Sequence, residues 1–171
     1  DGIRDKLVTG VQTCALPIFP FPPEFAKKYR EKGYWKDRTI AQEFADVFAK
    51  YSNRIAFWDG ERSYTYTDID KLSDRLALNL LDLGLKTQDR IVVQLPNVIE
   101  FVISYFALQK IGCIPIAALA THRYAEVSQF VNLSGASTCI FPESQGDFDF
   151  RPMIERVRKE NPHMKYGLVL G

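Results

Sequence analysis

Hydrophobic positions along the chain switch repeatedly between helical spacing and short continuous runs. Thr39–Tyr51 carries apolar residues on one helical face, and Thr67, followed three residues later by Asp70, opens a longer helical pattern that ends at Gly84. Short apolar runs typical of strands buried on both faces of a parallel sheet lie at Arg90–Leu95, Cys113–Leu119, Ser137–Phe141 and Tyr166–Leu170. Helices are predicted between these runs at Asn97–Ile111, Tyr124–Leu133 and Arg151–Glu160.

The N-terminal half adds a short helix and a hairpin to this pattern. A charged helix is predicted at Glu24–Lys32, and two β-like pieces, Ile55–Trp58 and Ser63–Tyr66, flank the turn signal Asp59-Gly60. The order of elements predicts an α/β fold with a mainly parallel sheet, right-handed crossovers and helices on both faces. Because the last predicted strand ends with the chain, we expect this sheet to be incomplete.

One loop invites a catalytic interpretation. Ala120–Arg123 follows an apolar strand and precedes a helix, and ligands of open α/β sheets bind beyond the carboxyl ends of strands. His122 is a side chain suited to proton transfer near pH 7. The alternative, which we favour, is a helix-start turn in which Thr121 is the cap and His122 holds neighbouring backbone.

Two further features are interpreted as structural. At the end of the preceding strand, Gln94–Asn97 contains Pro96, which fixes a turn, and Asn97, which can cap the next helix. A set of aromatic residues has the spacing of core packing and lacks the interleaved Lys and Arg of a base-stacking platform: Tyr64, Tyr66, Phe101, Tyr105 and Phe106.

Composition narrows the classes of protein. The 171 residues include 22 Lys and Arg against 21 Asp and Glu, a net charge of +1, and 46% are hydrophobic, all ordinary for one globular domain. The balanced charge gives no reason to expect nucleic acid or an anionic membrane as a partner. The longest apolar stretch, which begins at Ile91, is broken by Glu100 and Lys110, so no bilayer-spanning segment is expected.

The cysteines and histidines do not form a recognisable site. Cys14, Cys113 and Cys139 make no Cys-x-x-Cys pair, which favours inert thiols in a reducing, cytoplasmic compartment. His122 and His163 have no cysteine at ligand spacing, so zinc is not expected. The chain also lacks a dinucleotide fingerprint, a phosphate loop, a nucleophile elbow and a His-Glu-x-x-His motif. We therefore assign no catalytic, cofactor-binding or metal-binding residue.

Residues 1–18 differ in character from the rest of the chain. Asp1–Ile18 reads DGIRDKLVTGVQTCALPI and lacks both a periodic apolar face and the features of a secretory signal. It resembles translated sequencing-adapter read-through, and we interpret it as a non-native leader, the alternative being a disordered N-terminal extension. The end at Gly171 is then expected to be an assembly break as well.

Three motifs, in order, resemble the adenylate-forming superfamily of acyl-CoA synthetases, peptide-synthetase adenylation domains and luciferase. YTYTDI (Tyr64–Ile69) is similar to its first core motif and LQKIGCIP (Leu108–Pro115) to its second, with VQLPN (Val93–Asn97) between them. Three other segments resemble the branch of 2,3-dihydroxybenzoate–AMP ligases of siderophore pathways: Pro23–Trp35, Thr121–Arg123 and Phe148–Arg151. The resemblance covers residues 19–171 and identifies them as the first part of the family's N-terminal domain.

The resemblance implies an ATP- and Mg²⁺-dependent enzyme that adenylates a small aromatic carboxylate and passes the acyl group to the phosphopantetheine thiol of an aryl-carrier protein. The family's phosphate loop, aryl pocket and catalytic lysine come later than these residues, so the chain alone is expected to be inactive and to bind ATP poorly. Alternatives are part of a salicylate–AMP ligase or another acyl-CoA synthetase, a stand-alone α/β binding module, and a truncated product that misfolds.

Overall fold

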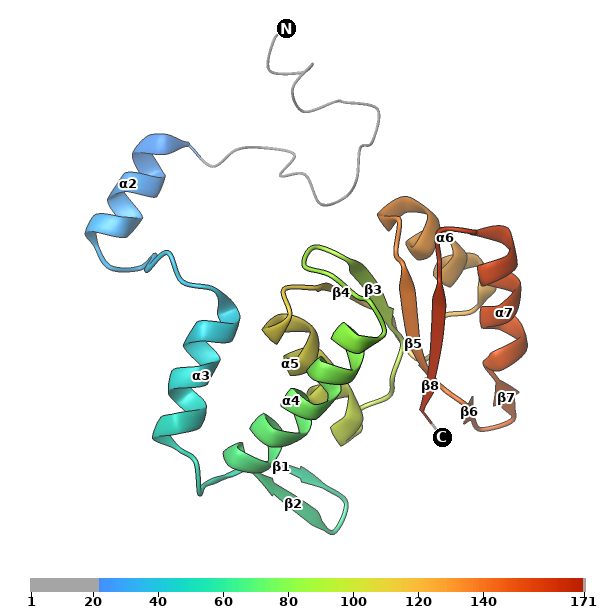
Figure 1. Cartoon of the computed structure of the whole chain (residues 1–171), viewed down its shortest axis with the longest axis horizontal. Helices are drawn as coiled ribbons and strands as arrows, with labels where there is room; N and C mark the ends of the chain where they lie inside the picture. The colour runs from blue at the N-terminus through green and yellow to red at the C-terminus, as the bar shows by residue number, and fades with distance from the viewer. Residues whose placement is uncertain (1–21, 171) are drawn as a thin grey trace, which may run out of the picture.

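The computed structural model describes residues 22–170 and shows a parallel sheet with helices on both sides (Figure 1). The helices are α2 (Pro23–Glu31), α3 (Ile40–Lys50), α4 (Tyr66–Asp82), α5 (Ile99–Lys110), α6 (Tyr124–Ser134) and α7 (Arg151–Glu160). The strands are β1 (Ile55–Asp59), β2 (Arg62–Thr65), β3 (Arg90–Val93), β4 (Ile114–Ala117), β5 (Thr138–Pro142), β6 (Ser144–Gln145), β7 (Phe148–Asp149) and β8 (Tyr166–Leu170). The interpretation of residues 1–18, Cys14 included, lies outside the described residues.

The main sheet has four strands in the order β4-β3-β5-β8, all parallel. The connection from β3 runs outward to β4, whereas the connection from β5 runs outward in the other direction to β8. The strand order therefore reverses between β3 and β5. In open α/β sheets this switch point, at the carboxyl ends of the strands, is where ligands bind.

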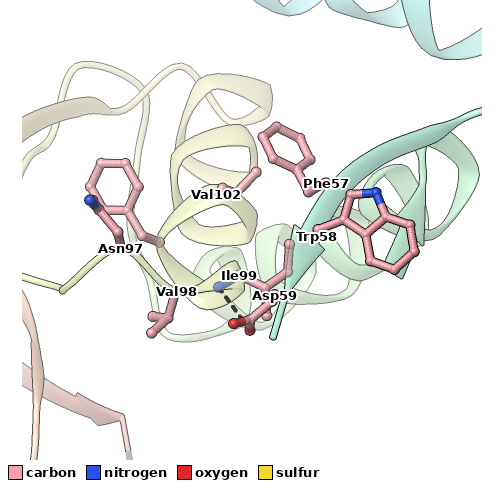
Figure 2. A pocket seen from close by; sticks show the side chains of 8 residues that line it. Phe57, Trp58, Asp59, Asn97, Val98, Ile99 and Val102 are labelled. Atoms are coloured by element: carbon pink, nitrogen blue, oxygen red, sulfur yellow. Dashed lines mark hydrogen bonds between the residues drawn. The ribbon is translucent and has the colours of Figure 1, made fainter. Parts of the chain in front are cut away.

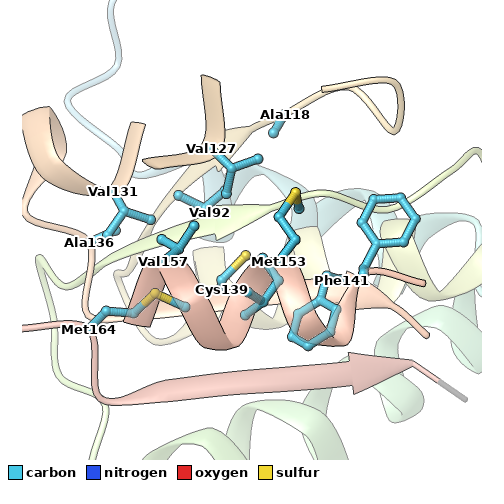
Figure 3. Packing of buried hydrophobic residues seen from close by; sticks show 12 residues of the cluster. Val92, Ala118, Val127, Val131, Ala136, Cys139, Phe141, Met153, Val157 and Met164 are labelled. Atoms are coloured by element: carbon cyan, nitrogen blue, oxygen red, sulfur yellow. The ribbon is translucent and has the colours of Figure 1, made fainter. Parts of the chain in front are cut away.

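Alternating residues of the sheet pack against helices on its two faces. Val92 and Cys139 belong to one buried cluster, which also contains residues of α6 and α7 (Figure 3). Ile91 and Val93 belong to a second cluster on the other face, completed by residues of α4 and α5. The central strands β3 and β5 are covered on both sides, which explains why they read as continuous apolar runs. The predicted α/β fold with helices on both faces is confirmed.

A third cluster lies away from the sheet, where α3, α4 and α5 meet the β1–β2 hairpin. Phe106 on α5 packs edge-on against Phe44 and Phe48 of α3, with ring centroids 4.8 and 5.1 Å apart. Tyr64 and Tyr66 are partly buried against the same cluster. The predicted role of these aromatic side chains in core packing is confirmed, although Phe101 packs with the cluster of α4 and α5 instead.

Two predicted helix starts and one predicted helix cap are wrong. Helix α4 is capped by Thr65, whose hydroxyl accepts from Asp68 N at 3.2 Å, whereas the Thr67 hydroxyl donates to Ser52 O at 3.0 Å. The N-cap of helix α5 is Val98 instead of Asn97. Helix α6 begins at Tyr124, as predicted, but its N-cap is Arg123 instead of Thr121. The β6–β7 hairpin, which turns at Gly146, was not predicted.

Gly112 ends α5 with a left-handed backbone, φ +72°, and we predict that Gly112→Ala is destabilising. An added Cβ would lie 2.9 Å from Thr87 Cγ2, so steric contact adds to backbone strain. We expect a loss of about 1–3 kcal/mol in the free energy of unfolding, measured by urea denaturation.

Gly84 provides the matched control, since it follows α4 at φ +94° and an added Cβ there meets nothing within 4 Å. Gly84→Ala should therefore show the backbone cost alone. Thr87→Ser removes the contacting methyl group and keeps the hydroxyl that donates to Ile111 O at 3.1 Å, so it should reduce the cost of Gly112→Ala. An equal cost in both backgrounds would contradict the steric explanation.

Candidate functional site

The carboxyl ends of β3 and β4 open into a cavity of about 480 Å³. Its walls come from the segment after β3, the segment after β4, one residue of α5 and the β6–β7 hairpin: Leu95, Pro96, Asn97, Phe101, Ala117, Ala118, Leu119, Ala120, Thr121 and Gln145. None of these residues is charged, and the polar groups are two amides and one hydroxyl. Such a lining suits binding of an uncharged or aromatic group and offers no base or activated nucleophile.

The side chain of Gln94 fixes the turn after β4 that forms part of the cavity wall. Its side chain is fully buried, and its Nε2 donates to Leu119 O at 3.0 Å and to His122 O at 2.9 Å. Its Oε1 is buried without a partner in the part of the chain that the structure describes. A buried amide that clamps two carbonyls of one turn fixes the path of that turn. The prediction of a structural role for Gln94–Asn97 therefore holds for Gln94 through a contact that local sequence does not reveal.

His122 holds backbone, as the structural alternative predicts. Its Nδ1 accepts from Leu119 N at 3.1 Å, and its ring meets Phe130 edge-on with centroids 5.2 Å apart. Arg123 completes the turn by donating from Nη1 to Ala120 O and His122 O, both at 2.9 Å. The Arg123 guanidinium also lies over the Phe148 ring, 4.1 Å from its centroid. These contacts tie the turn to the β6–β7 hairpin.

A second pocket, of about 280 Å³, lies between the β1–β2 hairpin and the start of α5 (Figure 2). Asp59 points toward α5 there, and its Oδ2 accepts from Ile99 N at 3.4 Å. This carboxylate therefore accepts a backbone N–H at the start of α5, where the N-cap residue Val98 provides no side-chain acceptor. Trp58 is 68% exposed at the rim.

Neither described cysteine is available for chemistry. Cys113 and Cys139 are free and buried, and burial raises their pKa to about 11 and about 12. Their thiols therefore stay protonated at neutral pH, as predicted for inert buried cysteines. Among residues 22–170, no group of three or more His, Cys, Asp or Glu side chains is placed to hold a metal ion. No helix in that range is long and apolar enough to cross a membrane.

Comparison with known proteins decides the family. The family model described as "AMP-binding enzyme" matches residues 44–170. This chain belongs to the AMP-binding enzyme family. Its match contains the two core motifs and the intervening Val93–Asn97, which confirms the resemblance to the adenylate-forming superfamily.

Individual relatives are aryl-acid ligases. The chain is 38% identical over 152 residues to the 2,3-dihydroxybenzoate-AMP ligase of Bacillus subtilis, and 34% identical over 157 residues to the salicyl-AMP ligase / salicyl-S-ArCP synthetase of Mycobacterium tuberculosis. Each match covers 89% of this chain and 28% of the relative. The apo structure of Mycobacterium smegmatis MbtA matches 88% of this chain, and 28% of its own, at a TM-score of 0.81 and 32% identity. The chain thus spans just over a quarter of the length of these relatives.

Proposed function

We propose that this chain forms the first part of an ATP-dependent ligase that activates 2,3-dihydroxybenzoate as its acyl-adenylate. The observation that carries the proposal is the 38% identity over 152 residues to a 2,3-dihydroxybenzoate-AMP ligase. In this proposal residues 19–171 begin the adenylating domain and supply scaffold, while residues 1–18 are a non-native leader. The turn held by Gln94 and His122 then shapes one wall of the enzyme's interior.

The proposed reaction has two steps. A carboxylate oxygen of the aryl acid attacks the α-phosphorus of ATP, an oxygen–phosphorus bond forms, and pyrophosphate leaves. The thiol of a phosphopantetheine group on an aryl-carrier protein then attacks the acyl carbon, and AMP leaves. No group of acidic or histidine ligands among the described residues fits Mg²⁺, so we assign the ion no residue and no step here.

The main alternative is a ligase that activates salicylate instead of 2,3-dihydroxybenzoate. Salicylate lacks one hydroxyl of 2,3-dihydroxybenzoate, and a ligase for salicyl-AMP is also a relative, at 34% identity. The proposal names 2,3-dihydroxybenzoate after the relative of higher identity, and the exchange assay with both acids decides between them.

The test uses the protein translated from the complete gene. We expect it to exchange labelled pyrophosphate into ATP in the presence of 2,3-dihydroxybenzoate, more weakly with salicylate, and not with a fatty acid or without acid. It should then load the acyl group onto an aryl-carrier protein. A complete gene that lacks a phosphate loop downstream, or an encoded protein without acid-dependent exchange, would contradict the proposal.

The 171-residue chain serves as the matched control, and we expect it to show no pyrophosphate exchange, because the polar groups that position phosphates lie outside it. Isothermal titration of the 171-residue chain with ATP tests the alternative of a stand-alone binding module. That alternative requires tight binding of ATP by the chain alone, whereas the proposal expects weak binding. Size-exclusion chromatography tests the alternative of a truncated product that misfolds. A monomer that also unfolds cooperatively would contradict that alternative.

A further inference from the structure

The turn that follows β4 is closed in both directions between Leu119 and His122. Leu119 O accepts from His122 N at 3.0 Å, and Leu119 N donates to Nδ1 of the His122 ring at 3.1 Å. The same turn carries Leu119, Ala120 and Thr121 of the cavity wall. The position of the imidazole therefore helps to fix the shape of this wall.

The hydrogen bond at Nδ1 sets the protonation state of His122. A backbone N–H is always a donor, so the ring nitrogen that faces Leu119 N must carry no proton. In this conformation His122 is therefore a neutral imidazole with its proton on Nε2. In an imidazolium both ring nitrogens carry a proton, so the ring could no longer accept from Leu119 N.

Charged groups of both signs lie around this imidazole. Arg123, the next residue, donates from Nη1 to His122 O at 2.9 Å and opposes a second positive charge. Glu126 on α6 interacts electrostatically with His122, and the backbone N–H of Arg123 lowers the pKa of its carboxyl, so it stays ionised where histidine titrates. Gln94 and Phe130, which bond to or pack against His122, are uncharged. Because the two charges act in opposite directions, the hydrogen bond at Nδ1 is what distinguishes the neutral from the protonated ring.

The other histidine of the chain has the opposite arrangement. The Nε2 of His163 lies 3.2 Å from Val131 O, and a carbonyl oxygen can only accept. A proton added to the His163 ring keeps this hydrogen bond, whereas a proton on Nδ1 of His122 removes one. Of these two side chains, His122 is the one whose charge is coupled to the closure of a turn.

We infer that His122 is a pH-sensitive switch in the wall of the cavity. The neutral imidazole holds the turn closed, and a proton on Nδ1 releases Leu119 N from the ring. The closed turn binds one proton fewer than the released turn, so it is favoured at higher pH and lost as the pH falls through the range in which histidine titrates. Gln94 is uncharged and keeps its hold on two carbonyls, which confines the change to the turn. The switch does not depend on the acid that the enzyme activates.

Amide exchange of Leu119 in the 171-residue chain tests this switch. The protection factor, which is the intrinsic exchange rate divided by the observed rate, is compared at pH 8 and pH 5, so that the pH dependence of the exchange chemistry cancels. We expect the Leu119 protection factor to fall by at least about tenfold, since one proton contributes up to a factor of ten per pH unit. The Gln94 amide, which donates to Ile140 O at 2.8 Å, should keep its protection and serves as the internal control.

Three variants separate the proton on the ring from the shape of the ring. In His122→Asn the side-chain Oδ1 is as many bonds from the backbone as Nδ1 is in histidine, and it can accept from Leu119 N at any pH. Its Leu119 protection factor should therefore be the same at both pH values. His122→Leu has no acceptor and should show the low protection at both. His163→Gln is the matched control and should keep the fall that the unsubstituted chain shows.

The nitrogen-15 chemical shifts of the His122 ring, recorded in the same titration, report its tautomer and its charge. A ring with its proton on Nδ1 at pH 8, or one that stays neutral at pH 5, would overturn the inference. So would a Leu119 protection factor that does not fall when the ring is protonated, or one that falls equally in His122→Asn. A parallel fall at the Gln94 amide would place the transition in the sheet instead of the turn, and would overturn the inference as well.

Discussion

Phe150→Ala is expected to lower the free energy of unfolding by about 3–5 kcal/mol, the range for removal of a buried aromatic ring. Phe150 is fully buried and is the largest side chain in that state among the described residues. It packs edge-on against Phe148 with centroids 4.8 Å apart and joins the cluster that α6 and α7 form over the sheet. Loss of the ring leaves a cavity where the β6–β7 hairpin meets the start of α7.

Urea denaturation of the 171-residue chain measures this loss. Phe150→Leu keeps most of the volume and should cost less than about 1.5 kcal/mol. Leu78→Ala, at a side chain 61% exposed on α4, should change the free energy of unfolding by no more than about 0.5 kcal/mol. A cost below about 1 kcal/mol for Phe150→Ala would mean that the site collapses around the missing ring or is not packed in solution.

The strands and helices of the sheet could be predicted because their apolar spacing and their burial have the same cause. Val92 and Val93 are adjacent and both buried, one toward α6 and α7 and the other toward α4 and α5. A strand covered on both faces must read as a continuous apolar run, so the pattern by itself predicts a parallel sheet.

The starts of α4 and α5 could not be predicted because local sequence offered equivalent choices. Thr65 and Thr67 are each followed three residues later by aspartate, so both fit a capping pattern. The choice depends on Ser52, whose carbonyl accepts from the Thr67 hydroxyl and comes from an earlier part of the chain. In the same way Asp59, distant in sequence, replaces Asn97 at the start of α5.

The cavity at the carboxyl edge was predicted only in part. The position of Ala120–Arg123 directly after a predicted strand indicated a ligand-binding edge, and the structure puts Leu119, Ala120 and Thr121 in the cavity wall. Gln145 was missed with its hairpin, although Gly146-Asp147 is a dipeptide typical of two-residue turns. The clamp by Gln94 joins residues of two strand ends and has no local signal at all.

This clamp makes Gln94→Glu the second large expected effect. A carboxylate at this position cannot donate to Leu119 O or His122 O, and it would be buried against two carbonyl oxygens. We expect a loss of about 3–5 kcal/mol at pH 7, as for other buried charges left without a partner. Gln94→Met, which is also without donors but is uncharged, should lose only about 1–2 kcal/mol, because each carbonyl keeps another donor.

The pH dependence of the free energy of unfolding separates the effect of the buried charge in Gln94→Glu from the effect of losing the amide. Burial raises the pKa of the introduced carboxyl in the folded state, so the folded protein binds more protons than the unfolded chain above the unfolded pKa. The stability of Gln94→Glu relative to the unsubstituted chain should therefore rise as the pH falls from 7 toward 5, since a protonated carboxyl can donate to one of the carbonyls. Gln94→Met should show no such trend. Urea denaturation of both variants at pH 7 and pH 5 measures the difference, and parallel behaviour of the two would mean that the introduced carboxyl is not buried in the folded chain.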